Sequence, residues 1–124
     1  MARRRALVLE DDVALRDLLL ETLASEAFEV RTCETFEEVC NAAARAAADV
    51  VIADFWGGSQ RTLSQSDGDD IRRLCSYLPV ILLTGRSWAS ETTAEELGAS
   101  ALIRKPFDLD DLLRTVEQIV ESQE

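Results

Sequence analysis

The sequence predicts an α/β domain in which five parallel strands form one sheet and helices cover both of its faces. Five short aliphatic runs are spaced along the 124 residues, at 6–10, 28–33, 49–54, 79–84 and 101–105. The third and fourth runs are apolar almost throughout, which is typical of parallel strands that are buried on both sides. Segments with helical periodicity separate and follow the runs, so the order of elements is strand then helix, five times over.

Three of these segments carry apolar residues at the three- and four-residue spacing of a helix face. They are Leu15, Leu18, Leu19, Thr22 and Leu23, then Phe36, Val39, Cys40, Ala43, Ala44 and Ala47, and finally Leu109, Leu112, Leu113, Val116 and Val120. Shorter helices are expected at 68–76 and 89–97, and Gly98 is placed to end the latter. With right-handed connections, five such units give an open, doubly wound sheet.

Length and composition indicate one folded domain spanning residues 1–124, with no effector domain in this chain. Hydrophobic residues make up 47% and charged residues 30% of the sequence, which argues against long disorder. No apolar run approaches the length of a membrane-spanning helix, and the opening "MARRRALVLEDD" becomes acidic too early for a signal peptide. We therefore expect a cytoplasmic protein without a membrane partner.

The charge and the residue types exclude several kinds of site. A net charge of −11 argues against direct nucleic-acid binding, because affinity for phosphates depends on clustered Lys and Arg. The three cysteines, Cys33, Cys40 and Cys75, are odd in number and show no paired spacing, so we expect buried thiols in a reducing compartment. The sequence contains no histidine, which rules out a histidine ligand or general base in this chain.

Polar residues with complementary chemistry follow four of the predicted strands. The first strand ends in Glu10, Asp11 and Asp12, and the others end in Asp54, in Thr84 and in Lys105 before Pro106. Ligand sites of doubly wound sheets lie beyond the carboxyl ends of the strands, so we expect these side chains to gather at one edge.

Crowded carboxylates repel one another, and a divalent cation removes that cost. Mg²⁺ suits this set, because it is usually held by one or two carboxylates together with waters and phosphate oxygens. A carboxylate can also attack phosphorus to form an aspartyl phosphate, whose oxygens need neutralising during transfer. The Lys105 ammonium and the Thr84 hydroxyl are suited to that task.

Four short motifs at these strand ends, "VLEDD", "VVIAD", "ILLTG" and "IRKPF", appear in this order along the chain. Together they resemble the receiver domain of two-component response regulators, and the resemblance covers essentially the whole sequence. It implies a flavodoxin-like (βα)5 fold with strand order 2-1-3-4-5.

The resemblance also implies a role for each matching residue. Asp54 is then the phosphoacceptor, Thr84 the hydroxyl that moves onto the phosphoryl group, and Lys105 the cation that binds it. Mg²⁺ is the implied cofactor. Its implied ligands are Asp11 and Asp54 by direct contact, Glu10 through water, and Trp56 through its backbone carbonyl.

Simpler structural roles remain open for each of these residues. Asp11 or Asp12 could be the N-cap of the first helix, and Asp54 could begin a turn. Thr84 could be an ordinary strand residue, and Lys105 with Pro106 could be an ordinary turn. Trp56 could be a lid on the core or could control the access of water to the phosphoryl group.

The sequence departs from the family pattern at two places. The family has a glycine eight residues after the acceptor, whereas the matching Gly68 comes 14 residues after Asp54, so the loop at 57–67 is expected to be extended by about six residues. We expect this loop to act as a mobile flap that alters phosphorylation or dephosphorylation. Leu102 stands where many receivers carry Tyr or Phe, so the family's aromatic switch cannot operate in its usual form.

The resemblance therefore predicts a regulatory phosphoacceptor switch and not an enzyme. Its implied partners are a sensor histidine kinase or a histidine phosphotransfer protein, and a downstream protein target. The target would bind the surface formed by the 89–97 helix, the 101–105 strand and the last helix, which is also a possible surface for oligomer formation.

The alternative is a degenerate receiver that serves as a docking module without phosphorylation. An aspartyl-phosphate hydrolase is disfavoured because Trp56 stands where its second acid belongs, and a flavin module because "EDDVALR" would repel phosphate.

Overall fold

The structure is a computed structural model that describes residues 4–45, 48–54, 65–84, 93–104 and 107–122. Five strands and five helices alternate along the chain. Their bounds are β1 Arg4–Glu10, α1 Val13–Ser25, β2 Phe28–Cys33, α2 Phe36–Ala44, β3 Val50–Asp54, α3 Gln65–Cys75, β4 Val80–Thr84, α4 Ala94–Leu97, β5 Ala101–Arg104 and α5 Leu109–Glu121. The strands form one parallel sheet in the order β2-β1-β3-β4-β5, which confirms the predicted fold class and strand order.

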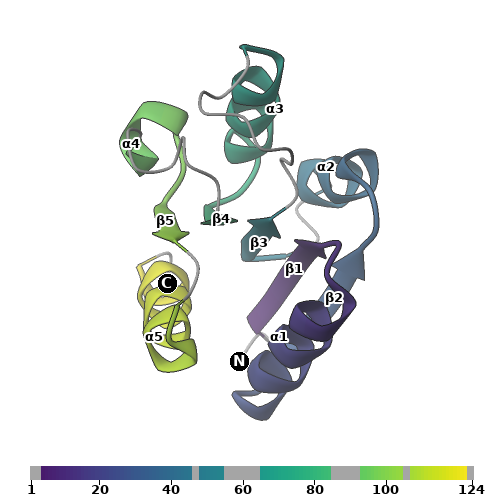
Figure 1. Cartoon of the computed structure of the whole chain (residues 1–124), viewed down its shortest axis with the longest axis vertical. Helices are drawn as coiled ribbons and strands as arrows, with labels where there is room; N and C mark the ends of the chain where they lie inside the picture. The colour runs from purple at the N-terminus through teal and green to yellow at the C-terminus, as the bar shows by residue number, and fades with distance from the viewer. Residues whose placement is uncertain (1–3, 46–47, 55–64, 85–92, 105–106, 123–124) are drawn as a thin grey trace.

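Two hydrophobic cores fill the space between the sheet and its helices. Figure 1 shows α1 and α5 on one face of the sheet and α2, α3 and α4 on the other. Successive strand residues point to opposite faces, so Ala6 and Val8 join the core under α1 and α5, while Leu7 and Leu9 join the core under the other three helices. Burial on both faces explains why the sequences of β1, β3 and β4 contain continuous apolar runs.

Polar caps fix where most of the helices begin. Asp12 is the N-cap of α1, because its side chain accepts a hydrogen bond from the backbone N–H of Leu15 (3.1 Å). Thr35, Thr93 and Asp108 cap α2, α4 and α5 in the same way. At the other end of α4, Gly98 adopts a left-handed conformation (φ 78°), which confirms the predicted helix stop.

The edge of the sheet at which the strands begin is held by Arg5 and Asp49. The backbone N–H of Arg5 donates to Oδ2 of Asp49 (2.9 Å), and the N–H of Asp49 donates to the carbonyl of Arg5 (2.9 Å). The guanidinium of Arg5 lies 3.7 Å from Oδ1 of the same carboxylate. These contacts tie the start of β1 to the residue before β3.

The structure corrects three details of the sequence-based prediction. Helix α3 begins at Gln65, so residues 65–67 of the predicted 57–67 loop are helical, while 57–64 lie outside the described residues. Leu18, which the periodicity assigns to the buried stripe of α1, is 43% exposed, because Leu19 and Leu23 define the side that faces the sheet. Ala44 is exposed at the end of α2. Among the described helices, none is long and apolar enough to cross a membrane.

Candidate functional site: the carboxyl edge of the sheet

Two carboxylates lie side by side where β1 and β3 end. Glu10 and Asp54 are register partners on these neighbouring strands. Glu10 is almost fully buried, with 2% of its surface exposed, and Asp54 is half-buried. Adjacent strands are about 4.8 Å apart, so the sheet itself brings the two acids together.

The other two acids of "EDD" have different surroundings. Asp11 and Asp12 are both exposed. The backbone N–H of Asp12 donates to Oε1 of Glu10 (3.1 Å), while the side chain of Asp12 caps α1. The N-cap role that the sequence left open between Asp11 and Asp12 therefore belongs to Asp12. The hydrogen bond from its amide to Glu10 could not be read from the sequence, because it depends on the turn between β1 and α1.

Thr84 ends β4 and is 3% exposed. Ala53 is opposite Leu82 in the register, so Asp54 is level with Leu83 and Thr84 lies one residue further toward the carboxyl edge. On its other side, Thr84 pairs with Arg104, the exposed last residue of β5. The described ends of β1, β3, β4 and β5 thus deliver a carboxylate pair, a hydroxyl and the residue before Lys105 to one edge. Lys105, Pro106 and Trp56 lie outside the described residues.

The donor set at this edge suits a hard divalent cation. Glu10 and Asp54 supply carboxylate oxygens from neighbouring strands, and Asp11 adds an exposed carboxylate to the same edge. Within the described ranges, no three acidic or thiol side chains are gathered closely enough to hold a metal ion by themselves. A pair of carboxylates is nevertheless the protein contribution that Mg²⁺ commonly uses, because water and phosphate oxygens complete its shell. The residues present therefore fit Mg²⁺.

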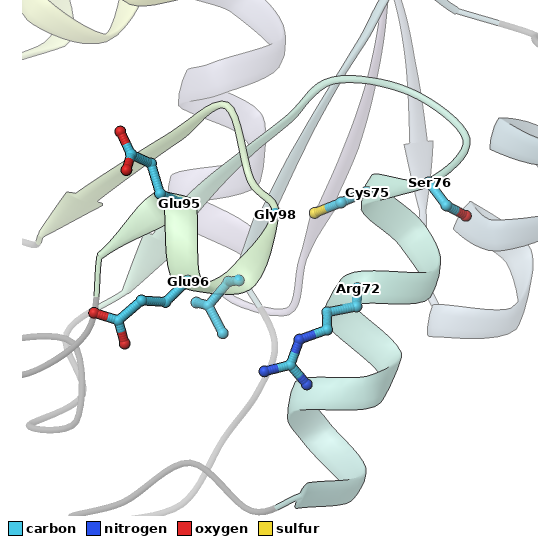
Figure 2. A pocket seen from close by; sticks show the side chains of 7 residues that line it. Arg72, Cys75, Ser76, Glu95, Glu96 and Gly98 are labelled. Carbon is cyan, nitrogen blue, oxygen red and sulfur yellow. The ribbon is translucent and has the colours of Figure 1, made fainter.

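A groove of about 340 Å³ lies between α3 and α4 (Figure 2). Arg72 of α3 reaches toward α4, and the sulfur of Cys75 points toward Gly98. Burial raises the pKa of the Cys75 thiol to about 11, so the thiol stays protonated near neutral pH and is a poor nucleophile. This groove does not share the chemistry of the strand ends.

The other two cysteines are fully buried in the core under α2, α3 and α4, as expected from the sequence. Cys33 is 0% and Cys40 is 1% exposed. Burial is the main cause that raises the pKa of Cys33 to about 11, and it also raises the pKa of Cys40. Both are free thiols that pack as small apolar side chains.

The fold and its acidic carboxyl edge define a doubly wound, parallel α/β protein with its polar site at the ends of the central strands. The model of the family described as response regulator receiver domain matches residues 6–117. The chain therefore belongs to the response regulator receiver domain family.

Similar sequences and structures agree with this assignment. The chain is 32% identical over 118 residues to the regulatory protein VirG of Agrobacterium tumefaciens (strain 15955), covering 91% of this chain and 42% of VirG. It is 31% identical over 128 residues to the DNA-binding transcriptional regulator NtrC of Escherichia coli (strain K12), covering 97% of this chain and 25% of NtrC. The chain thus spans less than half of the length of these curated relatives.

Among solved structures, the non-phosphorylated HemR receiver domain from Leptospira biflexa matches with a TM-score of 0.73 and 30% identity. The match covers 95% of this chain and 94% of the HemR chain. A CheY-like receiver domain protein from Methanospirillum hungatei JF-1 matches with a TM-score of 0.80 and 21% identity over 98% of this chain and 97% of the other, which supports the fold.

Proposed function

We propose that the chain is a phosphoacceptor switch in which Asp54 receives a phosphoryl group in the presence of Mg²⁺. The observation that carries this proposal is the register pairing of Glu10 with Asp54 at the end of β1 and β3. Two acids in this position, one of them buried, repel each other in the absence of a cation. The same pair becomes favourable when a divalent cation binds it.

The chemistry then rests on groups that the chain itself supplies. An oxygen of the Asp54 carboxylate forms a bond to the phosphorus of a phosphohistidine donor, and the bond from phosphorus to the histidine nitrogen breaks with its electron pair leaving on nitrogen. Lys105 and the hydroxyl of Thr84 neutralise and bind the phosphoryl oxygens. Mg²⁺, when bound by Asp11, Asp54 and the backbone carbonyl of Trp56, with Glu10 acting through water, supplies the remaining positive charge.

The donor would be a sensor histidine kinase or a histidine phosphotransfer protein in the cytoplasm. Leu18 supports a protein donor, because this large apolar side chain is 43% exposed on α1, the helix that begins directly after the acidic turn. An exposed apolar side chain next to a charged site is suited to contact with a protein surface. The chain itself would act as a regulatory domain that assists its own phosphorylation and dephosphorylation, and not as an enzyme on other substrates.

The output would be a population shift of the surface formed by α4, β5 and α5, which would bind a downstream protein. Thr84 supports this route, because it pairs with Arg104 of β5 and a movement of Thr84 would disturb that strand. NtrC is a DNA-binding regulator by name. We assign direct DNA contact to no part of this chain, whose net charge is −11.

A docking module that works without phosphorylation is the second candidate. Leu102 favours it, because this residue stands at the family's aromatic switch position and packs against the core under α2, α3 and α4. A branched aliphatic side chain held in a core does not turn inward and outward as an exposed ring can.

The two candidates differ in their response to a phosphoryl analogue. The protein is mixed with Mg²⁺ and either a small phosphodonor or beryllofluoride, and the adduct and the tryptophan fluorescence are followed by mass spectrometry and fluorimetry. The switch predicts one adduct, which Asp54→Asn and EDTA both abolish and which Asp12→Asn retains. An absence of any Asp54-dependent adduct would leave the docking module as the function.

A further inference from the structure

We infer that β2 is a self-association surface, at which a second copy of this chain pairs antiparallel to form one continuous sheet. Neither the family assignment nor the proposed phosphoryl chemistry provides this surface, and the inference does not rest on them. Three observations on the described residues support it: the position of β2 in the sheet, the order of its charges and the apolar flank of the helix above it.

Among the described strands, β2 is at the edge of the sheet and pairs with β1 alone. An edge strand can extend its sheet by pairing with another strand along its open side. All six residues of β2 are described, and the strand has no proline or glycine that would prevent such pairing.

The exposed charges of β2 complement those of a second copy. Phe28 and Val30 pack into the core under α1 and α5, which leaves Glu29 and Arg31 on the other face of the sheet, and both are exposed. In an antiparallel pair centred on Val30, Glu29 of each copy is directly opposite Arg31 of the other. A two-fold interface requires this kind of self-complementarity, because the same patch is used twice. Cross-strand pairs of opposite charge stabilise a sheet, whereas like charges directly opposite destabilise it.

A small pocket lies beside these residues. It has a volume of about 130 Å³ and is lined by Arg5 and Ala6 of β1 and by Glu29, Val30 and Arg31 of β2. The pocket lies along the strand pair that a second copy would extend.

The other face of the sheet offers an apolar contact at the same edge. Val13 is 57% and Leu20 is 37% exposed, and they are seven residues apart on α1, so they share one flank of that helix. Leu19 faces the sheet. In a right-handed β1–α1–β2 connection, the residue after a sheet-facing one turns toward the β2 side. Leu20 and Val13 therefore flank the open edge, whereas Leu18 turns toward α5.

A two-fold axis perpendicular to the sheet at Val30 leaves α1 of both copies on the same face. The α1 helices of the two copies then face each other across the axis, and the contact excludes water from Leu20, whereas Val13, at the start of α1, lies away from the level of Val30. The pairing therefore combines strand hydrogen bonds, two pairs of opposite charge and one apolar helix contact. The repulsion expected from the net charge of −11 is limited by salt, since the screening length is about 8 Å near 0.15 M ionic strength.

The experiment is sedimentation equilibrium of the whole chain near this ionic strength, without Mg²⁺ or phosphodonor. The wild type is expected to form a dimer. Arg31→Glu places a second acid opposite Glu29 of the other copy and is expected to weaken the dimer by about tenfold or more. The exchanged variant, Glu29→Arg with Arg31→Glu, restores the opposite pairs and is expected to restore the dimer, which also shows that a change at position 31 permits folding.

The matched control is Arg114→Glu, which makes the same change of charge on the exposed surface of α5. This variant is expected to leave the dimer unchanged. In the wild type, hydrogen exchange of the β2 amides is expected to slow as the protein concentration rises. A wild type that stays monomeric up to its solubility limit would overturn the inference. So would an Arg31→Glu variant that dimerises like the wild type, or a loss of the dimer in Arg114→Glu, which would locate association on the α4–β5–α5 surface.

Discussion

Glu10 and Asp54 are register partners on neighbouring parallel strands, and Glu10 is almost fully buried. Their closeness follows from the alignment of β1 with β3 and does not depend on any flexible segment. The fold therefore places two like charges side by side, and a cation or the loss of one charge lowers their mutual repulsion.

Asp54→Asn is expected to stabilise the metal-free protein, because it removes the repulsion between the two acids. The expected gain in the free energy of unfolding is about 1 kcal/mol, measured by urea denaturation in EDTA. Mg²⁺ should reduce or reverse the difference, since only the wild type keeps both carboxylates. Asp12→Asn is the matched control, because asparagine also caps helices well and the mutation removes an exposed acid. A less stable Asp54→Asn variant in EDTA would contradict this account.

Glu10→Gln is expected to weaken Mg²⁺ binding by about 10- to 100-fold, the range for groups that act on a metal through an intervening ligand. The glutamine keeps the size of the side chain and can still accept the hydrogen bond from the amide of Asp12. Isothermal titration calorimetry measures the affinity. The control variant Glu21→Gln, a substitution at an exposed position on α1, should bind Mg²⁺ with the affinity of the wild type. Equal affinities for all three proteins would show that Glu10 has no part in metal binding.

Thr84→Val is expected to separate phosphorylation from its structural response. Valine has nearly the shape of threonine and suits this buried position, but it lacks the hydroxyl. Asp54 should still form its adduct, while the NMR shifts of β5 and α5 that accompany adduct formation should be lost. Thr84→Ser keeps the hydroxyl and should retain them. Unchanged spectral shifts in Thr84→Val would remove Thr84 from the switch.

Leu102→Ala is expected to lower the free energy of unfolding by about 1–3 kcal/mol, because the leucine packs against the core under α2, α3 and α4 and is only partly buried. Leu18→Ala, at an exposed position, should change it by less than about 0.5 kcal/mol. Chemical denaturation measures both. If the two variants are equally stable, Leu102 is not held by the core and remains free to act as a moving switch residue.

The pKa of Cys33 predicts a loss of stability at high pH. Burial raises this pKa from 9.0 to about 11 in the folded protein, so the unfolded chain loses the thiol proton first as the pH rises. The contribution of the Cys33 thiol to the free energy of unfolding is fully present below pH 9 and is lost as the pH rises from 9 to 11. Cys33→Ala should show a shallower decline over that interval than the wild type. Parallel curves would mean that the thiol does not contribute to the pH dependence.

Much of this protein follows from the sequence by itself. Alternation of aliphatic runs with helical periodicity determined the fold class, because strands buried on both faces and amphipathic helices leave different patterns. Short polar motifs directly after the strands located Glu10, Asp54 and Thr84, because parallel strands bring their carboxyl ends to one edge. Gly98 was predicted to end α4, because a left-handed residue at that position favours glycine.

Only the tertiary structure decided how neighbouring residues divide their roles. Asp11 and Asp12 are chemically alike in the sequence, and the turn into α1 makes Asp12 the cap and brings its amide to Glu10. Leu18 and Leu19 are also alike, and the direction in which α1 crosses the sheet buries Leu19 and exposes Leu18. The edge position of β2 was implied by the resemblance and is confirmed, but the exposure of both Glu29 and Arg31 depends on which elements cover that strand, which local sequence does not encode. The physical reason is common to all three cases: local chemistry sets what a residue can do, and long-range packing sets which neighbour it meets.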